Sequence, residues 1–254
     1  MSENLLALVS VGFLAGSFGA LLGVGGGVIL VPGLILVAGL PFHSAVAASL
    51  VCVVATSVSG SAVYLKRGRV LLDVAVHLQF YTVGGAVLAG LVATRIPAAP
   101  LYLAFSVLLL VMAYRMIPLG KREGSGTRPA MGPGSPKVVA ASVGAGSVAG
   151  FLGVGGGILN VPILHLLMGQ PFDRAAATSV YMIGVTGAAA ALVYIARGDL
   201  DPALAGVTVL GTLAGAGVAA LVGDRFDERV LKVIFVVLLL YVAFRMGSRG
   251  LAAF

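Results

Sequence analysis

Charge is what this chain contains least of. Only 10% of its 254 residues are Asp, Glu, Lys or Arg, and 59% are hydrophobic, whereas a soluble domain carries about 25% charged residues. The mean hydropathy is +1.11. The apolar runs are too long and too many for one soluble core. The sequence therefore predicts an all-α polytopic membrane protein.

Groups that support catalysis or bind metals are also scarce. Cys52 is the single cysteine, and the three histidines, His43, His77 and His165, are scattered along the chain. No Asp, Glu, Lys or Arg lies in the middle of a predicted span, and no nucleophile has a base beside it. We therefore expect no enzymatic activity, no metal site and no cofactor. The net charge of +7 comes from short basic clusters between apolar runs, which is typical of cytoplasmic loops rather than of nucleic-acid binding.

What the chain does contain is a glycine cluster that occurs twice, at Gly23–Gly27 and again at Gly153–Gly157. The first cluster lies inside a run of 39 residues, 4–42, that has no charged side chain. A straight helix of that length would measure roughly 58 Å, against a hydrocarbon core of about 30 Å. The run must break, and we predict a helix over 5–22, an open glycine turn, and a shorter helix over 28–39.

The rest of the chain reads as long apolar helices on either side of one polar stretch. Residues 116–137 are rich in proline, glycine and basic side chains, which is typical of a flexible linker. We predict a first transmembrane repeat over 1–115, a cytoplasmic basic linker over 116–137, and a second repeat over 138–254. Outside the glycine breaks, the predicted helices are 43–65, 74–94, 98–115, 174–196, 202–222 and 230–246.

The two halves align at a constant offset of 130 residues. Of the 27 positions from 23 to 49, 15 are identical to their counterparts. Low complexity could produce matching glycines, but not the Pro41-Phe42 and Pro171-Phe172 pairs in the same register. We infer two homologous halves, each with about four transmembrane helices plus a glycine-broken short or re-entrant helix.

The relative orientation of the halves does not follow from charge. An even or an odd number of crossings per half places 11 of the 16 Lys and Arg residues in the cytoplasm. Both arrangements put residues 66–69 and the linker inside. We favour an inverted repeat because it is the commoner design among transporters.

Two homologous halves that each contain a broken helix point to a secondary transporter with its site between them. A glycine-rich turn before a helix exposes backbone N–H groups at the positive end of the helix dipole, and such a turn can form a nest for an anion. The alternative is that the glycines only permit a tight turn and close helix contact. Because no charge is buried, backbone dipoles are the strongest attraction available for an anion.

Candidate binding residues follow from the breaks and from polar side chains near them. Asn160 follows the second cluster at the position that Leu30 occupies in the first half. The proposed substrate-binding residues are Gly23, Gly25, Gly26, Gly27, Ser49, Gly153, Gly155, Gly156, Gly157, Asn160, Thr178 and Ser179. His77, Gln79 and Tyr181 are candidates for a proton carrier or for cavity lining. Hydrogen bonds between helices are the alternative role of each polar side chain.

The doubled motif Gly-x-Gly-Gly-Gly…Val-Pro-x-Leu, followed by Gly-x-Pro-Phe and Ala-x-Ala-[Ala/Thr]-Ser, resembles the sulfite exporter TauE/SafE family of bacterial membrane transporters. The resemblance covers the whole chain, including the duplicated halves and the polar linker. It implies an inner-membrane permease for sulfite, sulfoacetate or related organosulfonates. The motif positions are Gly23, Gly25, Gly26, Gly27, Pro32 and Ser49, with Gly153, Gly155, Gly156, Gly157, Pro162 and Ser179.

The sequence thus predicts a multi-pass transporter in a bacterial inner membrane that exports a small sulfur-containing oxyanion by alternating access. Two alternatives remain: an uptake permease for another anion, and a non-transporting membrane scaffold subunit. The expected partners are the lipid bilayer and the anionic substrate, without nucleic acid, and the chain is expected to be a monomer or a homodimer.

Overall fold

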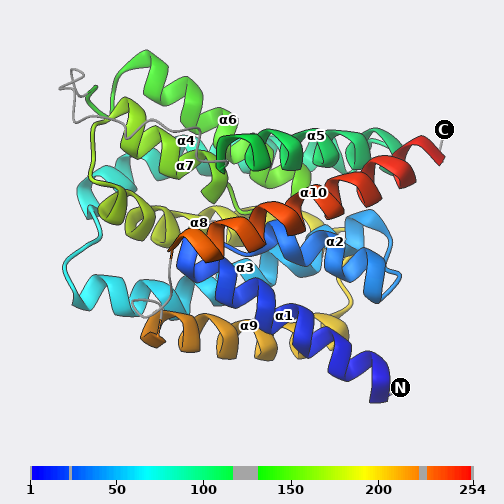
Figure 1. The fold of residues 1–254 in the computed structure, drawn as a ribbon. Helices are drawn as coiled ribbons and strands as arrows, with labels where there is room; N and C mark the ends of the chain where they lie inside the picture. The colour runs from blue at the N-terminus through cyan, green and yellow to red at the C-terminus, as the bar shows by residue number, and fades with distance from the viewer. Residues whose placement is uncertain (1, 23–24, 117–130, 223–227, 253–254) are drawn as a thin grey trace.

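The computed structural model describes residues 2–22, 25–116, 131–222 and 228–252, and these residues form helices without any strand (Figure 1). The predicted all-α class is therefore confirmed. Of the predicted linker, residues 117–130 lie outside the described part of the chain.

The helices follow the order that the sequence predicts, with bounds that mostly agree within two or three residues. The first half contains α1 (Ser2–Leu22), α2 (Gly27–Val37), α3 (Phe42–Lys66), α4 (Leu72–Ala93) and α5 (Ala98–Met116). The second half contains α6 (Pro136–Leu152), α7 (Gly157–Pro162), the π-helical η1 (Ile163–Leu167), α8 (Phe172–Ala196), α9 (Pro202–Val222) and α10 (Glu228–Ala252). Within the described ranges, five of these helices, α3, α4, α8, α9 and α10, are long and apolar enough to cross a membrane.

Two bounds differ from the prediction. The helix α6 begins at Pro136, inside the predicted linker, because proline suits the first turn of a helix, where its missing N–H has no partner to lose. The helix α10 continues to Ala252, beyond the predicted end at 246, since no glycine cap or proline stops it there. The helices α3 and α8 end as predicted, with Arg67 and Arg197 at their C-caps.

The helices α1 and α2 form a hairpin. Gly26, at the N-cap of α2, lies against Ala15 of α1, and Gly33, further along α2, lies against Val11. Residue numbers rise along α2 as they fall along α1, so the chain returns toward the side from which α1 started. The short helix α2 is therefore re-entrant.

The second half repeats this hairpin with α6, α7 and η1. Gly156, at the N-cap of α7, lies against Ala145 and Ala149 of α6. The backbone N–H of Met131, just before α6, donates a hydrogen bond of 3.0 Å to the carbonyl of Leu167. The helix η1 thus ends beside the start of α6, as a re-entrant segment must.

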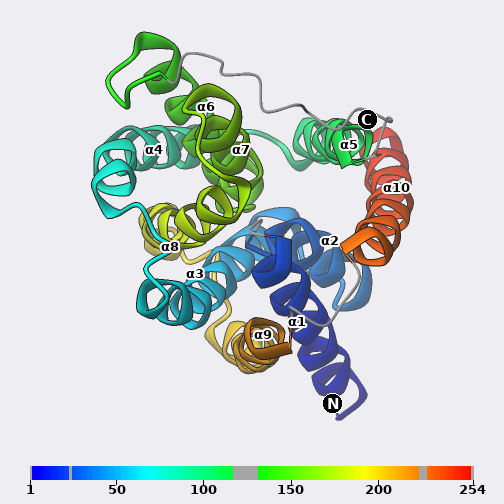
Figure 2. The same ribbon diagram turned by 60° about the vertical axis from the view of Figure 1, so that its left-hand side comes forward.

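Each half packs its fourth helix on the first helix of the other half, so α9 lies along α1 (Figures 1 and 2). Gly16 of α1 lies against the backbone of Thr212, and Gly215 of α9 lies against the backbone of Phe13. Residue numbers rise together in the two helices, so they run parallel. Glycines spaced four residues apart allow membrane helices to approach at backbone distance.

The pair α4 and α6 repeats these contacts at the offset of 130. Gly146 lies against the backbone of Thr82, and Gly85 lies against the backbone of Val143. These four residues are the counterparts of those that join α1 and α9. The two exchanged pairs are therefore built in the same way, and each ties one half of the chain to the other.

The equivalent helices α3 and α8 cross in opposite directions. The Ser57 hydroxyl donates a 2.6 Å hydrogen bond to the carbonyl of Val180, whereas Gly187, later in α8, lies against Leu50, earlier in α3. Since each of these helices begins where its re-entrant hairpin ends, the two hairpins enter from opposite sides.

The helices α5 and α10 are also antiparallel. The Ser106 hydroxyl donates to the carbonyl of Ala243 at 2.8 Å, and Gly250 lies against Leu103. Opposite directions of equivalent helices are what an inverted repeat requires, and they favour that orientation. The common origin of the two halves stays a prediction from the sequence. Figure 2 shows the α5–α10 pair standing apart from the remaining helices.

Candidate functional site

The two glycine breaks meet at the junction of the halves. Gly27, the first residue of α2, packs so closely on Gly153 and Val154 that an added Cβ would lie 2.7 Å from the Cα of Val154. Gly27, Gly153 and Val154 are all buried. The tip of each hairpin therefore contacts the other, which offset matching alone does not require.

Each break contains two consecutive glycines in the left-handed region. The φ angles are +83° at Gly25 and +74° at Gly26, and they are +73° at Gly155 and +77° at Gly156. Residues with a Cβ rarely adopt this backbone. The turns therefore depend on glycine at these four positions, as the sequence motif predicts.

The breaks lie level with the middle of the two longest central helices. A Cβ added at Gly25 or at Gly155 would meet the same two side chains, Val53 and Ile183. These side chains lie halfway along the 25-residue helices α3 and α8. A helix of that length is about 37 Å long and spans a hydrocarbon core of about 30 Å, so both breaks lie near mid-membrane.

The N-terminus of α2 is buried and has no side-chain cap, because its N-cap is Gly26. Gly27 and Val28 in its first turn are buried as well. The first N–H groups of a helix have no acceptor within the helix, and a buried helix end needs another partner for them. The helix dipole adds positive potential at this end, so the tip favours an anionic group.

Two predicted serines hold the breaks from neighbouring helices. The Ser49 hydroxyl of α3 donates a 2.8 Å hydrogen bond to the carbonyl of Gly153, across the two halves. The Ser179 hydroxyl of α8 donates to the carbonyl of Gly157 in its own half at 3.4 Å. Both serines are fully buried. The serine at the end of the sequence motif therefore contacts the break on both sides.

Asn160 is the polar side chain that distinguishes the second break. It is 2% exposed, and neither its Nδ2 nor its Oδ1 has a hydrogen-bond partner in the described part of the chain. Burying an amide without partners is unfavourable by about 1–3 kcal/mol. A side chain retained under that penalty points to a ligand.

Two other predicted site residues are not placed at the junction. The Thr178 hydroxyl oxygen accepts a 3.0 Å hydrogen bond from the backbone N–H of Leu71, in the connection before α4. His77 is exposed, with its ring 5.9 Å from that of Tyr81. Gly23 lies outside the described residues. Their roles in binding stay predictions.

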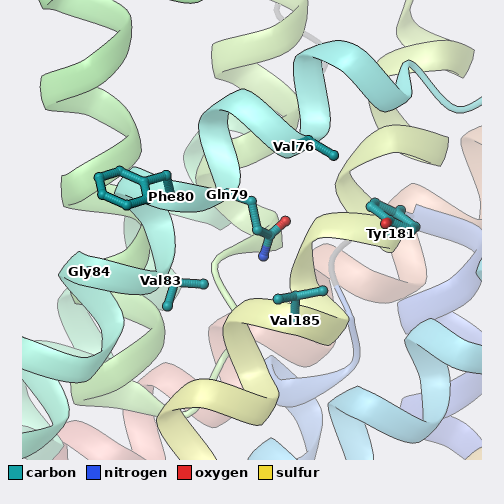
Figure 3. A pocket seen from close by; sticks show the side chains of 7 residues that line it. All are labelled: Val76, Gln79, Phe80, Val83, Gly84, Tyr181 and Val185. Atoms are coloured by element: carbon teal, nitrogen blue, oxygen red, sulfur yellow. The ribbon is translucent and has the colours of Figure 1, made fainter.

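Gln79 and Tyr181 line a lateral groove of about 560 Å³ between α4 and α8 (Figure 3). The other lining residues are Val76, Phe80, Val83, Gly84 and Val185. Phe80 is 80% exposed, so the groove opens on the lipid-facing surface. Gln79 Nε2 donates to the carbonyl of Met182 at 2.9 Å and to the hydroxyl of Thr186 at 3.0 Å. The amide thus joins α4 to α8.

Sequence reasoning did not single out Val53 and Ile183, which lie between the two breaks. They occupy equivalent positions at the offset of 130, and that correspondence was the available signal. An apolar residue in an apolar helix carries no further mark of its position. The contacts of Gly25 and Gly155 alone reveal it.

Two re-entrant half-helices that enter from opposite sides and meet at mid-span define a membrane transporter built from discontinuous helices. The polar groups at the junction are backbone, serine and asparagine groups, which can bind a small solute. The family described as sulfite exporter TauE/SafE matches residues 8–246. The chain belongs to this family, as the doubled glycine motif predicts.

Characterised relatives carry the same class of name. The chain is 27% identical over 256 residues to a probable membrane transporter protein of Xylella fastidiosa (strain 9a5c), covering 96% of each chain. It is 24% identical over 272 residues to the probable membrane transporter protein YunE of Bacillus subtilis (strain 168), covering 98% of this chain and 99% of the relative. No solved structure matches the chain. The predicted multi-pass location in a bacterial inner membrane is confirmed, with the lipid bilayer and a small molecule as partners.

Proposed function

We propose that this transporter exports small sulfur-containing oxyanions, such as sulfite or an organosulfonate, across the bacterial inner membrane by alternating access. In this proposal the two glycine breaks form the binding site. The observation that carries it is the meeting of two hairpin tips at mid-helix, with the uncapped N-terminus of α2 and the unpaired amide of Asn160 beside the junction.

The residue types at the junction suit an oxyanion. Backbone N–H groups at a helix start, hydroxyl groups and an amide donate hydrogen bonds to anionic oxygens. Because the site is formed where hairpins from opposite sides touch, a shift of one hairpin relative to the other would open it to one side of the membrane at a time. That geometry is the one expected for alternating access.

The test is flux into proteoliposomes and binding to purified protein, with sulfite, sulfoacetate, taurine, thiosulfate and sulfate as probes. We expect saturable uptake or efflux of at least one sulfur-containing anion. Binding of cations alone would refute the proposal.

The variant that tests the site must spare the fold. Gly26 is unsuitable, because any side chain there requires φ near +74° and meets the carbonyl of Ala15. Gly27→Ala keeps helical backbone but pushes against Gly153 and Val154, so we expect folded protein with little flux. The matched control is Gly144→Ala in α6, where an added Cβ meets nothing within 4 Å. Equal flux in wild type and Gly27→Ala would place the pathway elsewhere.

A further inference from the structure

The unpaired amide of Asn160 constrains the chemistry of the ligand. Its Nδ2 is a donor of two hydrogen bonds and its Oδ1 is an acceptor, and both atoms are buried without a partner among the described residues. A ligand that satisfied only one of these atoms would leave the other unpaired and costly. The ligand that fits must therefore present both an acceptor and a donor.

Asn160 lies on the helix face that is turned toward the junction. It follows Gly157 by three residues, and side chains three apart share one face of a helix. In the first half, the counterpart Leu30 stands in the same relation to Gly27, which faces Gly153 and Val154. Leu30 is fully buried. The offset therefore puts an amide in the second half where the first half places a plain apolar contact.

The charge that the junction can accept is limited. The buried polar residues of the described chain are serines, threonines and Asn160, and none of them is Asp, Glu, Lys, Arg or His. The free energy required to take an ion out of water rises with the square of its charge, and no buried cation offsets it here. Dipoles can hold a single negative charge far more readily than a double one.

We propose that the central site selects an oxyanionic group of one negative charge on a molecule that carries its own hydrogen-bond donor, and that Asn160 determines this selectivity. The amide Nδ2 donates to an anionic oxygen of the ligand, and Oδ1 accepts from the ligand's donor. A fully ionised oxyanion has only acceptors and would set an oxygen against Oδ1. This inference rests on the proposed function and makes its substrate class narrower.

Two kinds of molecule supply this chemistry. Hydrogen sulfite carries an acidic proton beside its charged oxygens, and an aminosulfonate such as taurine carries an ammonium group beside its sulfonate. Ethanesulfonate has a single charge but no donor, and sulfate has a double charge and no donor at neutral pH. These four probes separate the effect of charge from the effect of the donor, and they separate the two sources from each other.

The experiment measures binding of the four probes to the full-length protein and their flux in proteoliposomes. We expect hydrogen sulfite or taurine to bind roughly tenfold more tightly than ethanesulfonate, as the loss of about one hydrogen bond predicts, and sulfate to bind most weakly. In Asn160→Leu, which copies the first half, the preferred ligand should lose roughly tenfold in affinity, while ethanesulfonate binding stays nearly unchanged. Asn160→Asp, which replaces the donor by an acceptor, should reject all four anions.

A matched control is Ser142→Ala in α6, a buried polar side chain that bonds only to the carbonyl of Val138 one turn back. This variant should keep the wild-type preference, and thermal unfolding should show that Asn160→Leu is folded. If the wild type binds the anions without preference, or if Asn160→Leu weakens all of them equally, the inference is wrong and the proposed function stands. If the wild type binds none of the anions, the proposed function fails and the inference fails with it.

Discussion

The two re-entrant hairpins share a scaffold but differ in chemistry. Both carry a pair of left-handed glycines, and both place a break against Val53 and Ile183. They differ at the next helical turn, where the first hairpin has fully buried Leu30 and the second has buried, unpaired Asn160. An approximately symmetric frame thus holds an asymmetric site, and hydrogen bonding to the ligand falls to the second hairpin.

The hairpins also differ beyond this turn. The helix α2 remains α-helical past Pro32, with the N–H of Ala38 bonded to the carbonyl of Leu34. The second hairpin changes to a π-helix after Pro162, with the N–H of Met168 bonded to the carbonyl of Ile163. Single π-helical turns are frequent at functional sites. The departure from symmetry is therefore on the same hairpin as the asparagine.

The largest expected effect tests whether the exchanged helix pairs are equally tight. Gly16→Leu and Gly146→Leu each force a side chain into the backbone of a neighbouring helix, at Thr212 and Thr82. We expect each to destabilise the fold by more than about 3 kcal/mol, seen as lost folded protein and a lower thermal unfolding temperature in detergent. Gly144→Leu, with open space around it, should unfold like the wild type. A tolerated Gly146→Leu would show that α4 and α6 are not packed as α1 and α9 are.

The second prediction exchanges the residues that distinguish the hairpins. Leu30→Asn buries an amide among apolar side chains and should destabilise the protein by about 2–3 kcal/mol. Asn160→Leu removes an unpaired amide and should raise stability by about 1 kcal/mol while weakening transport. Thermal unfolding in the absence of anions measures both. A stability loss in Asn160→Leu would mean that the amide has a structural role.

The third prediction compares the two motif serines. Ser49→Ala removes a 2.8 Å bond that joins the halves, whereas Ser179→Ala removes a 3.4 Å bond within one half. We expect losses of about 1 kcal/mol for the first and a few tenths for the second, since shorter bonds contribute more. The comparison uses unfolding of both variants under the same conditions. Equal losses would mean that the two serines hold their breaks alike.

The smallest expected difference concerns two tyrosines at equivalent positions. The hydroxyl of buried Tyr194 donates to the carbonyl of Gly150 at 2.8 Å, and that of Tyr64 donates to the carbonyl of Ala20 at 3.3 Å. Tyr194→Phe should destabilise the protein by about 0.5–1 kcal/mol and Tyr64→Phe by less. The reverse order in thermal unfolding would contradict the difference between the two sides.

Local features of the chain predicted the elements well. The break at Gly23–Gly27 followed from charge-free length, because a 39-residue run exceeds one bilayer. The C-caps at Arg67 and Arg197 followed from the glycines after them. The change to a π-helix at Ile163 was not predicted, since no residue type there marks it. Thr178 was assigned to the site from its neighbour Ser179, yet its hydroxyl serves the backbone of Leu71.

The sequence by itself determined the membrane class, the positions of the helices, the two breaks and their offset, because hydropathy, chain length and glycine content act locally. The tertiary structure alone decided that α9 packs on α1 and α6 on α4, since glycine faces of this kind fit many helices. It also decided that the breaks meet beside Val53 and Ile183, and that Asn160 is left without a partner there. Those facts depend on contacts between residues more than 100 positions apart, which no local pattern records.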